Sequence, residues 1–265
     1  MPLSSYETLA LDTPAEGVLV VRINRPQVRN ALSTQTGRDL VDVFTGLAAD
    51  PHAHRCVILT GEGPHAFCAG VDLKERRGMT DEAWHRQHEL FERMMQAILE
   101  CPIPVIAAVN GAAYAGGCEL TLCADFAYAV PAARFALTEV KIGIMPGGGG
   151  TALLPRVVGL PRASEIILTG RPFSAEEALA WGVVNRLCEP DRLMADVMET
   201  ALAIAENAPL SIRQAKSSLR YGINVDLKSA MLYEIAAYNR LVHTRDRREG
   251  IDAFNERRKP QFRGE

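Results

Sequence analysis

The chain has 265 residues and a mass of 28.9 kDa, with 48% hydrophobic and 23% charged residues. This is an ordinary globular composition that can bury a full core, and one large domain is the default expectation. The formal net charge of −3 and the pI near 6.1 argue against nucleic acid or an anionic membrane as the main partner, and they favour a small molecule.

Five short apolar segments predict β-strands, and helical patterns separate them over most of the chain. This alternation is typical of an α/β protein with parallel strand pairings. The predicted strands cover residues 17–24, 56–60, 104–109, 126–130 and 183–187.

Helices are predicted between and after these strands. Over residues 80–100, apolar side chains recur at steps of three and four residues, and Cys-Pro-Ile-Pro ends the pattern. From Asp191 onward helical patterns dominate, with Asp226 capping a helix over 227–242 and Thr244 opening a last helix toward Arg258. We therefore expect an α/β core in residues 1–190 and a helical region in residues 191–265, both within one functional unit.

No targeting or membrane-spanning segment is recognisable. The N-terminus, Met-Pro-Leu-Ser-Ser-Tyr-Glu, lacks a basic region followed by an apolar stretch, and no apolar run is long enough to cross a bilayer. The six cysteines stand singly in apolar segments, which is typical of reduced core thiols. We expect a cytoplasmic protein without a membrane partner.

Histidines do not predict a metal site. His52 and His54 alternate, and His85 and His88 stand one helical turn apart, but both pairs lie among polar residues typical of a surface. Neither pair has a further cysteine, histidine or carboxylate at ligand spacing. We therefore predict that no metal is bound.

A dense glycine run covers residues 145–151, Met-Pro-Gly-Gly-Gly-Gly-Thr. It is not a P-loop, because no Gly-Lys-Ser/Thr follows the glycines, and Pro146 interrupts any dinucleotide-binding turn. The chain also lacks a Gly-x-Ser-x-Gly nucleophile elbow. The run is predicted to shape the wall of a ligand site.

Two glutamates are candidates for acid–base chemistry. Glu119 follows a glycine-rich turn that leaves strand 104–109 and opens a helical run over 119–123, a geometry that aims free backbone N–H groups at a ligand. Its apolar neighbours indicate a buried acid, which needs a partner or a role. For Glu139, flanked by polar residues, a solvated surface loop stays open as an alternative.

Backbone donors for a carbonyl oxygen are predicted in two small-residue segments. Ala69 and Gly70 follow Phe67-Cys68, and Gly116 stands three residues before Glu119. If the N–H groups of Ala69 and Gly116 converge, they form an oxyanion hole, helped by the positive end of the helix dipole.

Taken together, these segments resemble the crotonase superfamily, most closely the enoyl-CoA hydratases, over nearly the whole length of the chain. The resemblance rests on spaced motifs in the family order. They are Asn24-Arg-Pro-x-x-x-Asn-Ala-Leu32, Phe67-Cys-Ala-Gly-Val-Asp72, Asn110-Gly to Gly116-Gly-Cys-Glu119, Glu139 with Gly143-Ile-Met-Pro-Gly147, and Arg257-Arg-Lys-Pro-Gln-Phe262.

The resemblance implies a spiral of ββα units and an α-helical C-terminal region that mediates formation of a homotrimer, often paired into a hexamer. It implies an acyl-CoA thioester as substrate, with coenzyme A as part of that substrate and no separate cofactor. Helix 80–100 would wall the acyl pocket, with the side chains of Trp84, Phe91, Met94 and Met95.

The resemblance also implies roles for single residues. Ala69 and Gly116 would donate N–H groups to the thioester oxygen, and Gly70, Val71 and Asp72 would continue the acyl-CoA-binding loop. Glu119 would act on the water and Glu139 on the α-carbon, one ionised and one protonated. Arg25 and Lys259 are candidates for contacts with the phosphate-bearing end of coenzyme A.

Two alternatives to hydration stay open. An enoyl-CoA isomerase or another specialised crotonase would use the same enolate, although an isomerase generally manages with one acid–base residue. A homologue that binds coenzyme A or RNA without catalysis is suggested by the basic residues of the C-terminal tail, but acidic residues interleave them, as in a solvated helix with local ion pairs.

Overall fold

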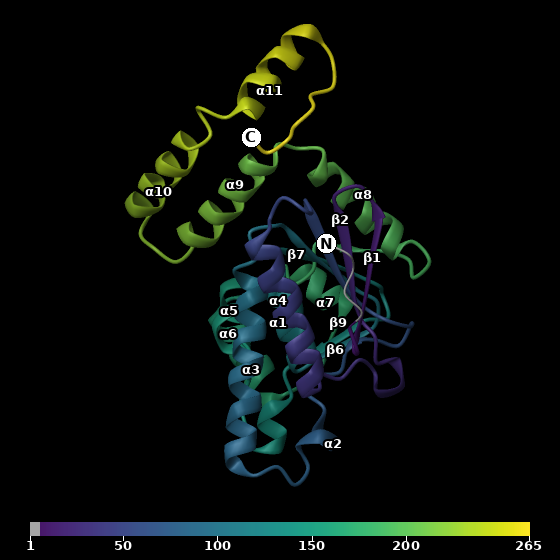
Figure 1. The fold of residues 1–265 in the computed structure, drawn as a ribbon. Coiled ribbons are helices and arrows are strands. Elements are labelled where there is room, and N and C mark those ends of the chain that lie inside the picture. The colour runs from purple at the N-terminus through teal and green to yellow at the C-terminus, as the bar shows by residue number, and fades with distance from the viewer. Residues whose placement is uncertain (1–5) are drawn as a thin grey trace.

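The computed structural model describes residues 6–265 and contains two β-sheets (Figure 1). The larger sheet has the strand order β1-β2-β3-β5-β7-β10. β1 pairs antiparallel with β2, and the other pairs are parallel. Its strands are β1 (Leu9–Ala15), β2 (Val18–Ile23), β3 (Cys56–Gly61), β5 (Val105–Val109), β7 (Phe126–Ala129) and β10 (Arg186–Leu187).

The smaller sheet has the order β4-β6-β8-β9, and only its β8–β9 pair is antiparallel. Its strands are β4 (Ala66–Cys68), β6 (Ala112–Tyr114), β8 (Arg134–Ala136) and β9 (Phe173–Ser174). These strands have only two or three residues each, too few for an alternating pattern to be recognised.

The two sheets grow together as the chain winds. β3 leads into β4, β5 into β6 and β7 into β8, so each turn gives one strand to the larger sheet and the next to the smaller one. Helices follow each pair. They are α2 (Leu73–Arg76) with α3 (Asp81–Leu99), then α4 (Gly116–Cys123), then α5 (Gly150–Val158) with α6 (Leu160–Thr169). This winding confirms the predicted spiral of ββα units.

The five predicted strands all belong to the larger sheet. Four of them match β2, β3, β5 and β7 closely, whereas only Arg186–Leu187 of the predicted 183–187 pairs as a strand. The sequence prediction missed α1 (Thr34–Ala49), whose first turn is capped by the hydroxyl of Ser33 accepting from the N–H of Thr36, and which packs against α3.

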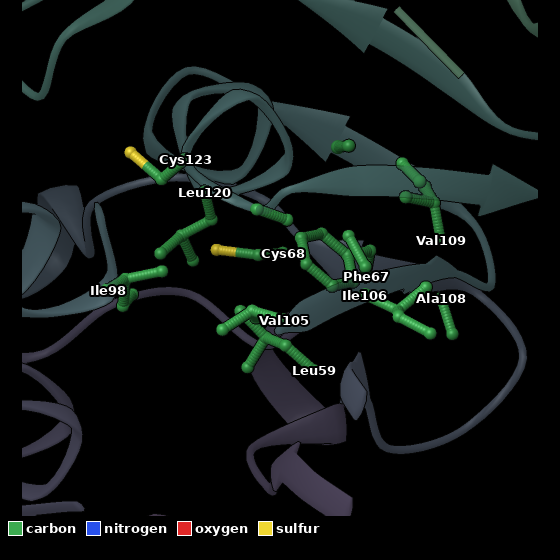
Figure 2. Packing of buried hydrophobic residues seen from close by; sticks show 14 of the residues in the cluster. Leu59, Phe67, Cys68, Ile98, Val105, Ile106, Ala108, Val109, Leu120 and Cys123 are labelled. Atoms are coloured by element: carbon green, nitrogen blue, oxygen red, sulfur yellow. The ribbon is translucent and has the colours of Figure 1, made fainter. Parts of the chain in front are cut away.

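The core lies between the sheets and the helices that cover them. β3 and β5 are buried along their whole length, which explains their continuous apolar sequences. Figure 2 shows Leu120 and Cys123 of α4 near Cys68 and Val105 in this packing. All six cysteines are free and buried, as predicted, and burial raises the pKa of Cys68 to about 12.

The rest of the chain is mostly helical. α7 (Ala175–Ala180) precedes β10, and α8 (Leu193–Ala205) packs on the larger sheet. α9 (Pro209–Gly222), α10 (Leu227–Asn239) and α11 (Arg245–Glu256) project from the body (Figure 1). Asp226 and Thr244 cap α10 and α11 as predicted, although α10 ends at Asn239 rather than Val242. None of the helices in residues 6–265 has both the length and the apolar character needed to cross a membrane.

Candidate active site

A cavity of about 490 Å³ lies where α3, α4 and the segments after β4 and β8 meet. Glu119 and Glu139 both line it, together with Ala69, Val71 and Gly116. The cavity therefore brings together the two candidate acids and both of the predicted donor segments.

Glu119 lies in the first turn of α4 and is 4% exposed. Its Oε1 accepts hydrogen bonds from the N–H groups of Gly148, at 2.8 Å, and Gly150, at 2.9 Å. The predicted ligand-wall segment thus binds the carboxylate itself. Burial raises the pKa of Glu119, and the two N–H donors and nearby His88 act against this rise by stabilising the ionised form.

Glu139 opens the 3-10 helix Glu139–Ile142 after β8 and is 7% exposed, so the alternative of a solvated surface loop is wrong. Its Oε2 is buried and has no hydrogen-bond partner among the described residues. Burial, with the charge of Glu119 adding to it, raises the pKa of Glu139 to about 7. The backbone N–H of Glu139 itself acts against this rise but does not cancel it, so Glu139 keeps its proton more readily than Glu119, whose carboxylate accepts two N–H groups of the glycine run.

The predicted backbone donor Ala69 requires a correction. Its N–H already donates to the carbonyl oxygen of Arg29, at 3.1 Å. Two residues later, Val71 forms a parallel bridge with Leu32. The N–H of Leu32 donates to Gly70 O at 2.8 Å, and Leu32 O accepts from the N–H of Asp72 at 2.9 Å.

Val71 lies between the two residues that bond Leu32, so its own N–H points away from that neighbour. No described acceptor takes this N–H, and Val71 lines the cavity. Gly116 is the first residue of α4, where a helix leaves its N–H groups without intrahelical partners. Of the two predicted donor segments, the free N–H groups at the cavity are therefore those of Val71 and Gly116.

The donor segments approach each other closely because side chains are absent there. At Gly70, with φ of 92°, a Cβ would lie 2.8 Å from Ala115 Cβ, and at Gly117 one would lie 2.0 Å from Cys68 O. Ala115, between β6 and α4, has φ of 49° and ψ of −119°, a conformation that costs a non-glycine residue free energy.

The side chains of Asp72 and Arg25 are bound to each other. Arg25 Nη2 lies 3.0 Å from Asp72 Oδ2, while Asp72 Oδ1 accepts from the first N–H groups of α2. Lys259, in the C-terminal segment, pairs with Glu206 at 2.5 Å and does not line the cavity. Contacts of Arg25 and Lys259 with coenzyme A stay predictions.

Helix α3 forms one wall of the cavity. Trp84, Phe91 and Met95 line it, whereas Met94 is fully buried in the core and does not, contrary to the prediction. His88, which the sequence places among surface residues, also lines the cavity. Its spacing from Trp84 and Phe91 was the signal that could have found it.

Arg76 is another lining residue that the sequence did not predict. It is 7% exposed, although Lys74-Glu-Arg-Arg77 has the appearance of a solvated charge run. No pattern in the local sequence separates Arg76 from the exposed Arg77 beside it.

The basic C-terminal tail forms local ion pairs, as its interleaved charges predict. Arg245 pairs with Glu265, and Arg258 pairs with Glu249 and Glu256. Within residues 6–265 no group of three or more histidine, cysteine, aspartate or glutamate side chains is placed to hold a metal ion.

The sequence profile described as Enoyl-CoA hydratase/isomerase matches residues 13–265. The crotonyl-CoA hydratase of Syntrophomonas wolfei is 36% identical over 258 residues, which cover 97% of this chain and 98% of that protein. The mitochondrial methylglutaconyl-CoA hydratase of Mus musculus is 35% identical, covering 96% of this chain and 82% of that protein. A crystal structure of an enoyl-CoA hydratase from Bacillus anthracis matches with a TM-score of 0.95 and 40% identity, over 98% of this chain and 100% of that one.

Proposed function

Because the chain belongs to the enoyl-CoA hydratase/isomerase family, we propose that it adds water across the 2,3 double bond of a 2-enoyl-CoA to give a 3-hydroxyacyl-CoA. One observation carries the proposal. Two buried carboxyl groups line the same cavity, and their surroundings favour an ionised Glu119 and a protonated Glu139. Hydration needs one base and one acid in this arrangement.

In the proposed reaction, Glu119 takes a proton from the water while the water oxygen bonds to C3 of the enoyl group. The electron pair of the double bond moves onto the thioester oxygen and forms an enolate. Glu139 then donates its proton to C2 as the carbonyl reforms. At the end of the reaction Glu119 is protonated and Glu139 is ionised, and proton exchange with solvent restores the starting state.

The N–H groups of Val71 and Gly116 are proposed to hold the enolate oxygen, in place of the predicted pair Ala69 and Gly116. The argument is that Val71 has a free N–H at the cavity and Ala69 does not. The N-terminus of α4 adds partial positive charge at Gly116. Donors of this kind typically contribute about a hundred- to a thousandfold in rate each.

The proposal is tested by following the loss of conjugated thioester absorbance with short, long and branched 2-enoyl-CoA substrates. Glu119→Gln and Glu139→Gln should each lower kcat by about a hundredfold or more. Glu199→Gln, in an exposed position on α8, is the matched control and should keep parental kcat. A folded protein that binds coenzyme A but hydrates none of these substrates would overturn the proposal, and turnover of a 3-enoyl-CoA would then identify an isomerase.

Self-association as a homotrimer, or as a hexamer of two trimers, is proposed for the C-terminal helices. It is supported by large apolar side chains that α9, α10 and α11 leave exposed, including Leu219, Leu227, Tyr238 and Phe254. Light scattering of the purified chain should give a multiple of three protomers, and a monomer at micromolar concentration would contradict this.

Lys259→Ala should weaken coenzyme A binding at unchanged kcat.

A further inference from the structure

Four residues of α3 line the cavity. Met95, Phe91, His88 and Trp84 follow one another at steps of four, three and four residues on one helix face. A helix rises 1.5 Å per residue, so this face spans about 16 Å. Its two ends differ in chemistry.

The Met95 end adjoins the proposed reaction centre. A Cβ on Gly148 would lie 3.0 Å from Met95 Cε and 2.7 Å from Glu119 Oε2, so these groups share one corner of the cavity. At the other end, Trp84 lies under the guanidinium of Arg76, whose Cζ is 3.9 Å from the ring centre. Arg76 belongs to α2, which lies beside the start of α3 (Figure 1).

Arg76 is a buried cation without a carboxylate partner. No described carboxylate forms an ion pair with it, and its Nε donates to Gln87 Oε1 at 2.8 Å. Gln87 in turn donates to Thr34 Oγ1, at 2.8 Å, and to Glu75 Oε2, at 3.2 Å. The side-chain amide of Gln87 therefore fixes the orientation of the guanidinium through its Nε.

The neighbouring acid does not neutralise this cation. Glu75 Oε2 accepts from the N–H of Thr34, at 2.9 Å, in addition to Gln87, and it makes no ion pair with Arg76. Burying an unpaired ion costs free energy, and stacking on Trp84 offsets only part of that cost. Burial accordingly lowers the pKa of Arg76, while the charge of Glu75 raises it.

Two nitrogens of the guanidinium are left for a ligand. Nη1 and Nη2 have no hydrogen-bond acceptor among the described residues, and the side chain lines the cavity. Two parallel N–H groups on a planar fork match the two oxygens of a carboxylate, and such bidentate pairs are stronger than neutral hydrogen bonds.

We propose that Arg76 selects acyl groups whose far end carries a carboxylate, so that the preferred substrates are ω-carboxy-2-enoyl-CoA thioesters. The inference rests on the proposed hydratase function for its reaction, but the recognition of the carboxylate does not depend on turnover. Glu119 and Glu139 would act at the thioester end while Arg76 binds the other end of the same acyl chain.

The test compares matched substrates in the full-length protein. Each 2-enoyl-CoA ending in a carboxylate, from five to twelve acyl carbons, is paired with the thioester of the same length ending in a methyl group and with the corresponding primary amide. At the best length, the carboxylate should have a kcat/KM about tenfold to a hundredfold above both neutral partners, as expected for one charge-assisted pair.

Variants assign this preference to Arg76. Arg76→Met should reduce the ratio of kcat/KM between carboxylate-ended and methyl-ended substrates to about one, and Arg76→Lys, which keeps the charge but not the fork, should retain part of that ratio. Arg77→Met, the same change at the exposed neighbouring position, should retain all of it. An undiminished preference in a folded Arg76→Met or Arg76→Lys protein would overturn the inference, as would a parent that prefers the neutral substrates.

Binding of unreactive saturated thioesters separates this inference from the hydratase proposal. At the best chain length of the series, calorimetry should show tighter binding of the saturated ω-carboxyacyl-CoA than of the methyl-ended thioester, and Arg76→Met should remove the difference. If this pattern appears without hydration of any substrate, the hydratase proposal fails and carboxylate recognition stands. If neutral enoyl-CoA substrates are hydrated well and no ω-carboxyacyl-CoA of the series has an advantage, carboxylate recognition fails and the hydratase proposal stands.

Discussion

Replacing Glu139 with glutamine should make the protein progressively more stable relative to the parent as the pH rises. In the folded state the pKa of Glu139 is raised from 4.5 to about 7, so the folded protein holds this proton more tightly than the unfolded chain does. The stability that this proton contributes is complete below pH about 4.5 and is lost as the pH rises through about 7. Glutamine at this position does not titrate, so it makes no such pH-dependent contribution to the free energy of unfolding.

The magnitude follows from the size of the pKa difference. One pKa unit corresponds to about 1.4 kcal/mol, so ionising the buried carboxyl costs the parent about 3 kcal/mol in full, of which about 2.5 kcal/mol falls between pH 5 and pH 8.5. The glutamine amide leaves an unpaired donor where Oε2 lies without a partner, at a cost of about 1–3 kcal/mol that is the same at every pH.

The assay is urea unfolding of parent and Glu139→Gln at pH 5, 6, 7 and 8.5, at one fixed protomer concentration. The free energy of unfolding of Glu139→Gln minus that of the parent should increase by about 2.5 kcal/mol across this series. Glu199→Gln, at an exposed site, should show a constant difference from the parent. A difference for Glu139→Gln that does not change with pH would refute the assigned environment of Glu139.

Three further predictions concern the same site. The kcat/KM for hydration should fall about tenfold per pH unit above pH about 7 as Glu139 loses its proton, and a rate that stays constant from pH 6 to 9.5 would exclude Glu139 as the acid. Gly148→Ala places a Cβ 2.7 Å from Glu119 Oε2 and should lower kcat by about a hundredfold. The control Gly46→Ala lies in α1, where the new Cβ would have no atom within 4 Å, and it should keep kcat and add about 0.5–1 kcal/mol of stability. Equal activity of the two variants would contradict the positioning of Glu119 by the glycine run. Ala115→Gly should raise the free energy of unfolding by about 1 kcal/mol in urea titrations, because glycine relieves the strain at φ of 49°, and a loss of stability would show that the strain is small.

The larger sheet and the ends of several helices could be predicted from the amino-acid sequence alone. β3 and β5 are buried on both faces, so their sequences are continuous apolar runs that stand out from the helical patterns around them. Thr80, Asp226 and Thr244 cap their helices by accepting from the N–H group three residues further on, and interactions this local are visible in sequence.

The candidate acids were also predictable, for different reasons. Glu119 stands between apolar neighbours after a glycine-rich turn, and this local pattern is enough to indicate a buried acid. Glu139 has polar neighbours, so the local sequence left a solvated loop open and the family resemblance was needed to favour a catalytic role. Its burial depends on the packing of a short 3-10 helix against segments distant in sequence.

Which groups face the cavity depends on the tertiary fold. Ala69 loses its N–H to Arg29, and Val71 keeps its own free because Leu32 bonds the residues on either side, so both outcomes depend on a segment about forty residues away. Arg76 and Arg77 are adjacent and chemically identical, yet Gln87 and Trp84 bury one while the other stays exposed. Backbone partners and the burial of charge arise from contacts between distant segments, and no local pattern of residues encodes them.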